Sequence, residues 1–213
     1  MTYLVKEIFY TVQGEGAHSG RPAVFVRFAG CNLWSGREED RATARCQFCD
    51  TDFVGTDGDG GGRFATATDL VAAALAHWPG ADAREARPFV VCTGGEPLLQ
   101  LDAPAIEEFR RVGFEIAVET NGTVDVPDGL HWLCVSPKAG NALKVTSGSE
   151  LKLVYPQSNL QPDEVADMAF DHFFLQPMDG PDAEANTAAA LAYCMEHPHW
   201  KLSLQTHKLL GVP

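Results

Sequence analysis

The chain has 213 residues, of which 45% are hydrophobic, and its 16 Lys and Arg against 29 Asp and Glu give a formal net charge of −13. This length fits one domain, expected over residues 1–213 and able to bury about 70% of its unfolded surface. The acidic charge argues against nucleic acid and against a basic membrane-surface protein, so we expect a small-molecule partner. Because the sequence shows no signal segment and no run of about 18 apolar residues, we also expect a cytoplasmic protein without a membrane span.

Short apolar runs alternate with helical patterns along the chain. A strand is expected at 25–28, and a helix at 68–76 that opens with a Ser/Thr/Asp-type cap. A strand at 89–93 is followed by an Ala- and Glu-rich helical stretch through Ile106 and Phe109. Further strands are expected at 114–120, 132–136, 150–155, 172–176 and 201–205, with a helix over 186–196.

Strands that alternate with helices predict a parallel sheet, whose functional loops lie at the carboxyl ends of the strands. The chain is shorter than the roughly 250 residues of a complete eight-unit barrel. We therefore expect an incomplete, open TIM-like barrel, an α/β fold of about six parallel strands with some helices lost. The glycine-rich run 57–62 is expected to form a flexible loop.

Three cysteines follow the first predicted strand: Cys31, then fourteen residues, then Cys46 and Cys49. No fourth cysteine or histidine is close enough in sequence to complete a local metal site. Three thiolates on a four-iron cluster leave one iron open, and an open iron can bind and activate a ligand. The alternative is a structural zinc site, completed by a distant His or Cys. The remaining cysteines have apolar neighbours and are expected in the core: Cys92, Cys134 and Cys194.

Three features in this order resemble the radical S-adenosylmethionine (SAM) enzymes. They are the cysteine group, the aromatic Phe48 before the last cysteine, and the Gly-Gly-Glu-Pro run at 94–97 after the next strand. Within that superfamily, segments covering most of the chain resemble the 7-carboxy-7-deazaguanine synthase family: 9–16, 25–33, 46–51, 93–97, 119–122, 136–138, 176–178 and 205–208.

The cysteine spacing departs from the superfamily pattern. The common C-x3-C-x2-C arrangement would place a cysteine at position 35, where this chain has Ser35. Cys46 takes that role after an insertion, residues 36–45, which is expected to be a solvated charged helix. Arg37, Arg41 and Arg45 in it could alternatively form a basic patch for an electron donor.

The resemblance implies a [4Fe-4S] cluster held by Cys31, Cys46 and Cys49, with SAM bound at the open iron as the source of a 5′-deoxyadenosyl radical. The implied reaction converts 6-carboxy-5,6,7,8-tetrahydropterin to 7-carboxy-7-deazaguanine by ring contraction and loss of ammonia, in the biosynthesis of queuosine and other 7-deazapurines. Mg²⁺ is a further implied cofactor, with Thr51 as its ligand. A flavodoxin-like electron donor and a homodimer are the implied partners.

The substrate carboxylate is expected to bind Arg27, at the end of the strand that leads to Cys31, although a surface salt bridge is the alternative. The other substrate residues that the resemblance implies are Val12, Gln13, Gly14, Glu15, Thr93, His207 and Pro213. Gln13 and Glu15 suit the amide and amino edge of a pterin. The last residues are expected near the active site, where Pro213 would close the pocket and offer its α-carboxylate, so a C-terminal tag should impair turnover.

The SAM contacts that the resemblance implies are Phe48, Gly95, Glu96, Glu119, Ser136, Pro137, Lys138, Gln176, Pro177, Met178 and Asp179. Gly94 and Gly95 would let the backbone approach the methionine amino group. The segment 136–138 suits the ribose or carboxylate of SAM, and 176–179 suits its adenine. For Glu119 two interpretations stay open, a ribose ligand or a buried structural carboxylate.

Three alternatives come from other classes. A radical SAM activase of a partner protein would need neither a pterin-shaped pocket nor Mg²⁺. A zinc-binding interaction module would be colourless and would not cleave SAM. A SAM-binding relative that has lost catalysis would retain the cluster and lack substrate turnover.

Overall fold

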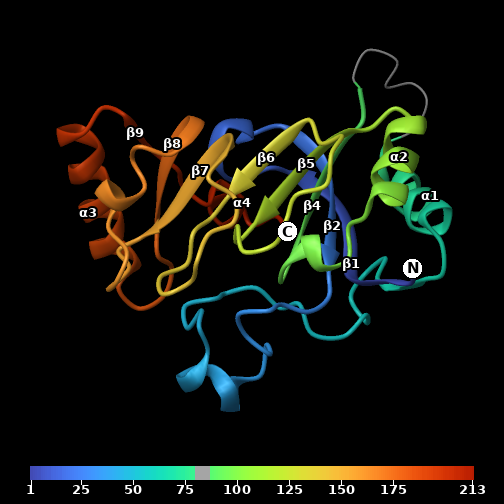
Figure 1. Ribbon diagram of the computed structural model, residues 1–213, viewed down its shortest axis with the longest axis horizontal. Helices are drawn as coiled ribbons and strands as arrows, with labels where there is room; N and C mark the ends of the chain where they lie inside the picture. Colours follow the sequence, from blue (N-terminus) through green and yellow to red (C-terminus); the bar gives the residue numbers. More distant parts are fainter. Residues whose placement is uncertain (80–86) are drawn as a thin grey trace.

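The structure is a computed structural model that describes residues 1–79 and 87–213. Within these residues the centre of the fold is one nine-stranded sheet with the order β3-β1-β2-β4-β5-β6-β7-β8-β9 (Figure 1). The strands are β1 Tyr3–Val12, β2 Pro22–Phe28, β3 Gly62–Phe64, β4 Phe89–Gly94, β5 Glu115–Thr120, β6 Trp132–Val135, β7 Ser147–Tyr155, β8 Ala169–Pro177 and β9 Trp200–Leu202.

The sheet is mostly parallel and is not closed. From β2 through β9 each strand runs parallel to its neighbour in the sheet, whereas β1 and β3 are antiparallel. The predicted parallel α/β architecture is therefore confirmed in this coarser form. The predicted count of about six parallel strands is too low, because the sheet has nine strands: β1 and β3, which were not expected, and seven that run parallel.

The two missed strands have a common physical explanation. A pattern in which strands alternate with crossover helices predicts only parallel strands. Neither β1 nor β3 is preceded by such a crossover helix. In β1 a bulge between Val5 and Glu7 also interrupts the two-residue period, so that Tyr3, Val5 and Ile8 face the core out of simple alternation. The glycine-rich run before β3 is a loop bonded to β1, since Gly58 N donates to Lys6 O at 2.9 Å.

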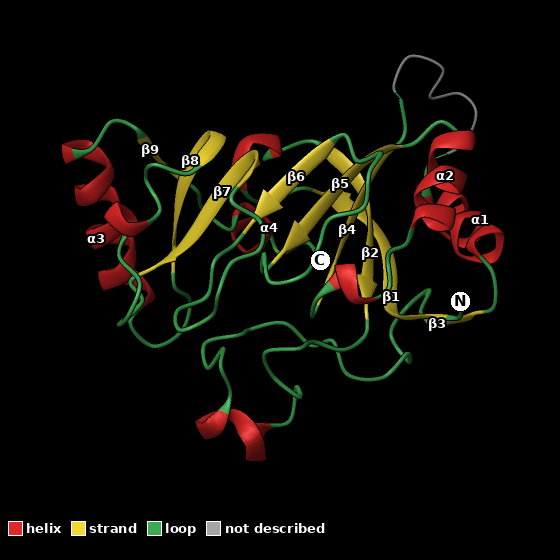
Figure 2. Cartoon of the chain, viewed as in Figure 1, coloured by secondary structure: helices red, strands yellow, loops and turns green. Residues whose placement is uncertain are grey.

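In the part of the chain that the structure describes, four α-helices accompany the sheet: α1 Ala67–His77, α2 Ala103–Arg111, α3 Ala183–Glu196 and α4 Thr206–Leu210. Figures 1 and 2 show α1 and α2 at one end of the sheet and α3 at the other. Helix α1 begins earlier than predicted, because the cap is Thr66 rather than Thr68. Thr66 Oγ1 accepts from Asp69 N at 3.1 Å, and the Asp69 carboxylate accepts from Thr66 N at 3.1 Å.

Two large apolar clusters fix α1, α2 and α3 on the sheet. The first joins side chains of α1 and α2 to those of strands β1, β2, β4 and β5, and the second joins α3 to β7, β8 and β9. Cys92 and Cys134 are buried as predicted, and Cys194 packs against the second cluster. Among the described residues no helix combines the length and the apolar character needed to cross a bilayer.

The end of β4 packs closely on the loop that carries the first cysteine. Gly94 has a φ of +142°, and a Cβ there would lie 2.2 Å from the Phe28 carbonyl oxygen. A Cβ on Gly95 would lie 2.2 Å from the carbonyl oxygen of Gly30. Only glycine allows this approach, so the Gly-Gly pair places β4 against the Cys31 loop.

Candidate active site

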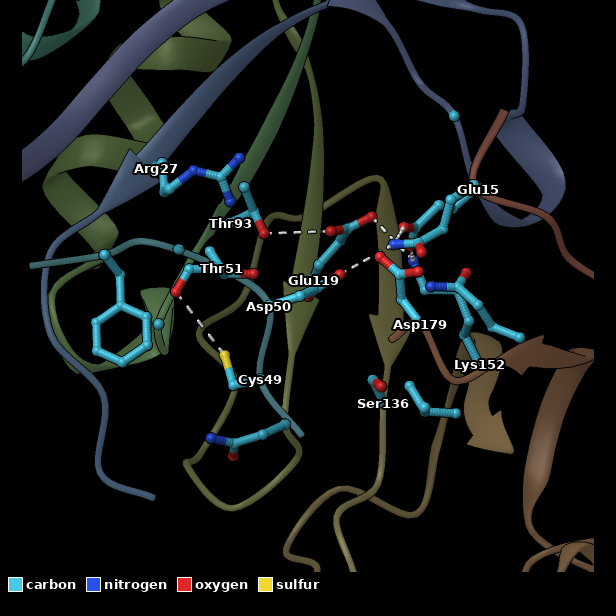
Figure 3. A pocket seen from close by; sticks show the side chains of 18 of the residues that line it. Glu15, Arg27, Cys49, Asp50, Thr51, Thr93, Glu119, Ser136, Lys152 and Asp179 are labelled. Carbon is cyan, nitrogen blue, oxygen red and sulfur yellow. Dashed lines mark hydrogen bonds and ion pairs between the residues drawn. The ribbon is translucent and has the colours of Figure 1, made fainter. Parts of the chain in front are cut away.

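A cavity of about 360 Å³ lies where the parallel strands end, bordered by loops from both halves of the chain (Figure 3). The predicted site residues that line it are Val12, Gln13, Gly14, Glu15, Arg27, Cys31, Cys46, Phe48, Cys49, Thr51, Thr93, Gly95, Glu119, Ser136, Lys138, Gln176, Pro177, Met178, Asp179, His207 and Pro213. The fold therefore gathers residues from Val12 to Pro213 around one space.

The three predicted cluster cysteines border this cavity from two arms of the chain. Cys31 follows β2, and Cys46 and Cys49 follow the insertion. The Cys46 and Cys49 thiols share a hydrogen bond, which lowers the pKa of Cys49 to about 6 and raises that of Cys46. Burial raises the pKa of Cys31.

A single metal ion and a four-iron cluster place different demands on these thiols. In the described part of the chain no three His, Cys, Asp or Glu side chains converge to hold one metal ion. A structural zinc ion needs four donors around one point. In a cubane each thiolate binds a different iron, so a four-iron cluster needs three thiols around one space, and Cys31, Cys46 and Cys49 all line this cavity.

Lys152 joins two carboxylates in the lining of the cavity and was not predicted as a site residue. It lies on β7, and its Nζ donates to Glu15 at 2.6 Å and to Glu119 at 3.2 Å. Glu119 also accepts from Gln13 Nε2 at 3.0 Å and from Thr93 Oγ1 at 3.1 Å (Figure 3). This network fixes four predicted site residues relative to one another through a single buried cation.

Electrostatics hold the network in one charge state. Burial alone would raise the pKa of Glu15, but the charge and hydrogen bond of Lys152, with a hydrogen bond from Gln205, bring it to about 2. Burial would likewise lower the pKa of Lys152, and the surrounding acidic groups raise it well above its ordinary value. Both groups are therefore charged at neutral pH, and the site presents fixed charges to a ligand.

Arg27 fits both of the interpretations given for it. Its Nε donates to Glu7 Oε1 at 2.6 Å, which is the salt bridge, while the residue also lines the cavity. The guanidinium lies 5.7 Å from the centroid of the Phe9 ring. Because Glu7 engages Nε, the terminal nitrogens stay available to a carboxylate in the cavity.

Glu96 and Pro137 are the two predicted site residues outside the lining of this cavity. Glu96 is fully buried and accepts from Leu98 N at 3.1 Å, Thr120 Oγ1 at 2.8 Å and Asn121 N at 2.8 Å. Burial raises its pKa. Its carboxylate thus holds the ends of β4 and β5 together, and Pro137 lines a smaller neighbouring cavity.

Lys138 lies beside the cysteines. Its Nζ donates to the Ser136 carbonyl oxygen at 2.7 Å and to Ser136 Oγ at 2.6 Å, and it is 6.0 Å from the centroid of the Phe48 ring. Burial lowers its pKa, and the neighbouring Cys46 and Cys49 thiols act in the opposite direction. Three of the predicted SAM residues, Phe48, Ser136 and Lys138, therefore lie next to one another in the cavity lining.

Helix α4 closes one side of the cavity. The Gly14 carbonyl oxygen accepts from Thr206 N at 3.0 Å and from Thr206 Oγ1 at 2.9 Å. A Cβ on Gly14 would lie 2.0 Å from His207 Nδ1, so glycine is required there. Lys208 donates to Asp50 at 2.7 Å and also pairs with Asp179. Sequence analysis missed Lys208 and Asp50 as site residues, although 205–208 had stood out as a motif.

A mostly parallel α/β sheet with three thiols at its strand ends and a polar cavity beside them defines the class of radical SAM enzymes. No protein-family model matches the chain. The chain is 62% identical to 7-carboxy-7-deazaguanine synthase of Caulobacter vibrioides and 60% identical to that of Burkholderia multivorans, in each case over the full length of both proteins. The chain therefore belongs to the 7-carboxy-7-deazaguanine synthase family of radical SAM lyases.

A solved structure agrees with this assignment. The crystal structure of QueE from Escherichia coli superimposes with a TM-score of 0.66 at 28% identity, covering 96% of this chain and 94% of that one. The resemblance stated from the sequence is thereby confirmed. The alternatives of a partner-protein activase and of a zinc or SAM-binding module are not supported.

Proposed function

We propose that this enzyme converts 6-carboxy-5,6,7,8-tetrahydropterin to 7-carboxy-7-deazaguanine, with residues 1–213 acting as a single catalytic domain. The observation that carries the proposal is one cavity that three thiols and a charge-fixed polar network share. When bound, a [4Fe-4S] cluster with SAM supplies the radical that starts the ring contraction. The three thiols that border the cavity are suited to hold such a cluster.

The side chains of the chain itself orient the substrate. Arg27 is suited to pair with its carboxylate through the terminal guanidinium nitrogens, since Glu7 already fixes Nε. Gln13 and Glu15 offer amide and carboxylate groups to the pterin edge. Because Lys152 and Glu119 hold these groups in place before binding, little reorganisation is needed when the substrate arrives.

SAM is proposed to bind to other residues of the same cavity lining. Gly95 offers backbone close to Cys31, and Ser136 with Lys138 is suited to the ribose or carboxylate of SAM. The segment Gln176 to Asp179 is suited to the adenine, with Phe48 covering the cluster side. Glu119 is committed to Gln13, Thr93 and Lys152, which favours the structural interpretation of this carboxylate over a ribose ligand.

Mg²⁺ is proposed to bind at Thr51, which lines the cavity two residues after Cys49. Mg²⁺ commonly keeps several waters and shares its remaining positions with a substrate oxygen, so one protein hydroxyl is a sufficient anchor. The test is isothermal titration of the substrate with and without Mg²⁺. Thr51→Val should remove the Mg²⁺ dependence and leave SAM binding unchanged.

A flavodoxin-like electron donor and a homodimer complete the proposal. The insertion helix η2, Glu38–Thr43, is exposed but carries three acidic residues in its first turn, so a basic docking patch on it is not favoured. Exposed apolar side chains on α3 and α4 support self-association: Leu191, Met195, Leu209 and Leu210. Light scattering of the purified protein tests the dimer.

Anaerobic reconstitution with iron and sulfide, followed by electron paramagnetic resonance with and without SAM, tests the cofactor assignment. A four-iron signal that changes on addition of SAM is expected, and the carboxylated tetrahydropterin should then yield 7-carboxy-7-deazaguanine. A protein that binds zinc and gives no such signal would overturn the proposal. A SAM-responsive signal without product would overturn the assigned reaction.

A further inference from the structure

The insertion at 36–45 separates the first cluster cysteine from the other two, yet it is highly organised. Its helix η2 projects away from the sheet (Figure 1). Backbone contact closes the segment, because Arg45 N donates to Leu33 O at 3.0 Å. Ser35, which occupies the position of the usual cysteine, donates through its Oγ to Asp40 at 2.6 Å. The long spacer is therefore folded back on itself.

Arg41, the fourth residue of η2, contacts the chain on both sides of the insertion. Its Nη1 donates to the carbonyl oxygens of Gln47 at 2.8 Å and of Cys49 at 3.0 Å. Its Nε donates to the Glu38 carboxylate at 2.7 Å, which fixes the plane of the guanidinium. One side chain thus holds the segment that carries Cys46 and Cys49.

The same guanidinium stacks on the other arm. Its central carbon lies 4.1 Å from the centroid of the Trp34 ring, three residues after Cys31. Trp34 is 7% exposed, its indole N–H donates to Arg37 O at 3.1 Å, and its ring packs edge-on against Phe53 at 5.6 Å. Trp34 and Phe53 both line the cavity. The Trp34 ring is therefore held in a fixed position in the lining of the cavity.

We propose that Arg41 is the positioning residue that holds the Cys46 and Cys49 segment at a fixed distance from the Cys31 arm, in place of the short spacer of the common pattern. The planar guanidinium of Arg41 can stack on Trp34, pair with Glu38 and donate to two carbonyl oxygens at once, which a lysine ammonium cannot do. A flexible fourteen-residue spacer would allow many separations of the thiols. The role toward a cluster rests on the proposed function, whereas the ordering of the cysteine segment does not.

The test compares Arg41→Met and Arg41→Lys with Arg37→Met. Arg37 is a matched control because it lies in the same insertion, its side chain is 70% exposed, and its nearest carboxylate, on Glu39, is 3.8 Å away. The first readout is the rate at which iodoacetamide alkylates Cys46 in cluster-free protein, followed by peptide mass spectrometry. Cys46 is 5% exposed, so its alkylation reports opening of the segment.

Arg41→Met is expected to speed Cys46 alkylation by about tenfold or more, because it removes hydrogen bonds from a charged donor. In Arg37→Met the rate of Cys46 alkylation should equal that of the natural protein. Arg41→Met and Arg37→Met should have the same melting temperature. The second readout is iron release to a chelator after reconstitution, which should follow the same order. Cys46 protection equal in Arg41→Met and Arg37→Met would overturn the proposal, as would full protection in Arg41→Lys.

The same experiment tests the proposed function and the positioning role of Arg41 separately. If the natural protein retains no iron while Arg41→Met still exposes Cys46, the positioning role stands and the cluster assignment falls. If the natural protein binds a cluster and all three variants release iron at its rate, the positioning role falls and the cluster assignment stands.

Discussion

Replacing Lys152 by methionine tests whether the buried cation governs the site. The Lys152 side chain is 5% exposed and pairs with Glu15 and Glu119. The pKa of Glu15 is held at about 2 against 4.5, and at about 1.4 kcal/mol for each unit this corresponds to about 3 kcal/mol of folding stability. Breaking a buried ion pair by removing one partner typically costs about 3–5 kcal/mol. We therefore expect Lys152→Met to lose about 3–5 kcal/mol, a large part of a typical domain's stability.

Urea unfolding of the cluster-free protein at pH 7 measures this loss. Lys144→Met is the matched control, since Lys144 pairs with Asp125 on the surface, with side chains 54% and 85% exposed, and should change stability by less than about 1 kcal/mol. Adding Glu15→Gln to Lys152→Met should recover part of the loss by removing one uncompensated charge. A Lys152→Met protein as stable as Lys144→Met would refute the reasoning.

The pH dependence gives an independent check on the same pair. Because the pKa of Glu15 is lowered in the folded protein, its stabilisation is present above about pH 4.5 and is lost as the pH falls toward about 2. Lys152→Met lacks this contribution at every pH. The gap in stability between the natural protein and the variant should therefore narrow over that window, and a constant gap would contradict the assignment.

Three further predictions concern residues in or next to the cavity. Lys208→Met should weaken substrate binding about tenfold in calorimetry because α4 loses its ties to two loops, with little change in urea stability since Lys208 is 40% exposed. Glu96→Gln should lose about 2 kcal/mol in urea, because an amide N–H₂ would face one of three buried donors. Gly14→Ala should raise KM at a nearly unchanged melting temperature, since its Cβ would displace His207 and α4. Tight binding by Lys208→Met, full stability of Glu96→Gln or an unchanged KM for Gly14→Ala would each contradict the corresponding contact.

The edge of the sheet that carries the cavity could be predicted from the strand pattern, because parallel strands bring their carboxyl ends to one edge, whereas most of the individual lining residues came from the family resemblance. Arg27, Thr93 and Glu119 all lie at or near such ends and all line the cavity. Lys152 could not be found in this way. It lies between Leu151 and Leu153 in an apolar strand, and only the tertiary fold brings two carboxylates to it.

The direction in which a side chain points is the other property that could not be predicted from the sequence. Glu96 lies directly beside the cavity-lining Gly95, but its carboxylate turns inward to cap the Thr120 and Asn121 turn, which a motif cannot indicate. The insertion was predicted to be charged and solvated, and its 3-10 helix is indeed exposed. Arg41 is the exception, because its guanidinium lies over the Trp34 ring and donates to the carbonyl oxygen of Gln47.

The docking of α4 on the Gly14 turn has a consequence for how the enzyme is made. Residues 12–15 line the same cavity as Gln205, His207, Lys208 and Pro213, although nearly two hundred residues separate the two segments along the chain. During synthesis on a ribosome, the cysteine arms emerge long before Lys152 and α4. The side of the cavity that Lys152 and α4 contribute is therefore formed after the side that carries the thiols.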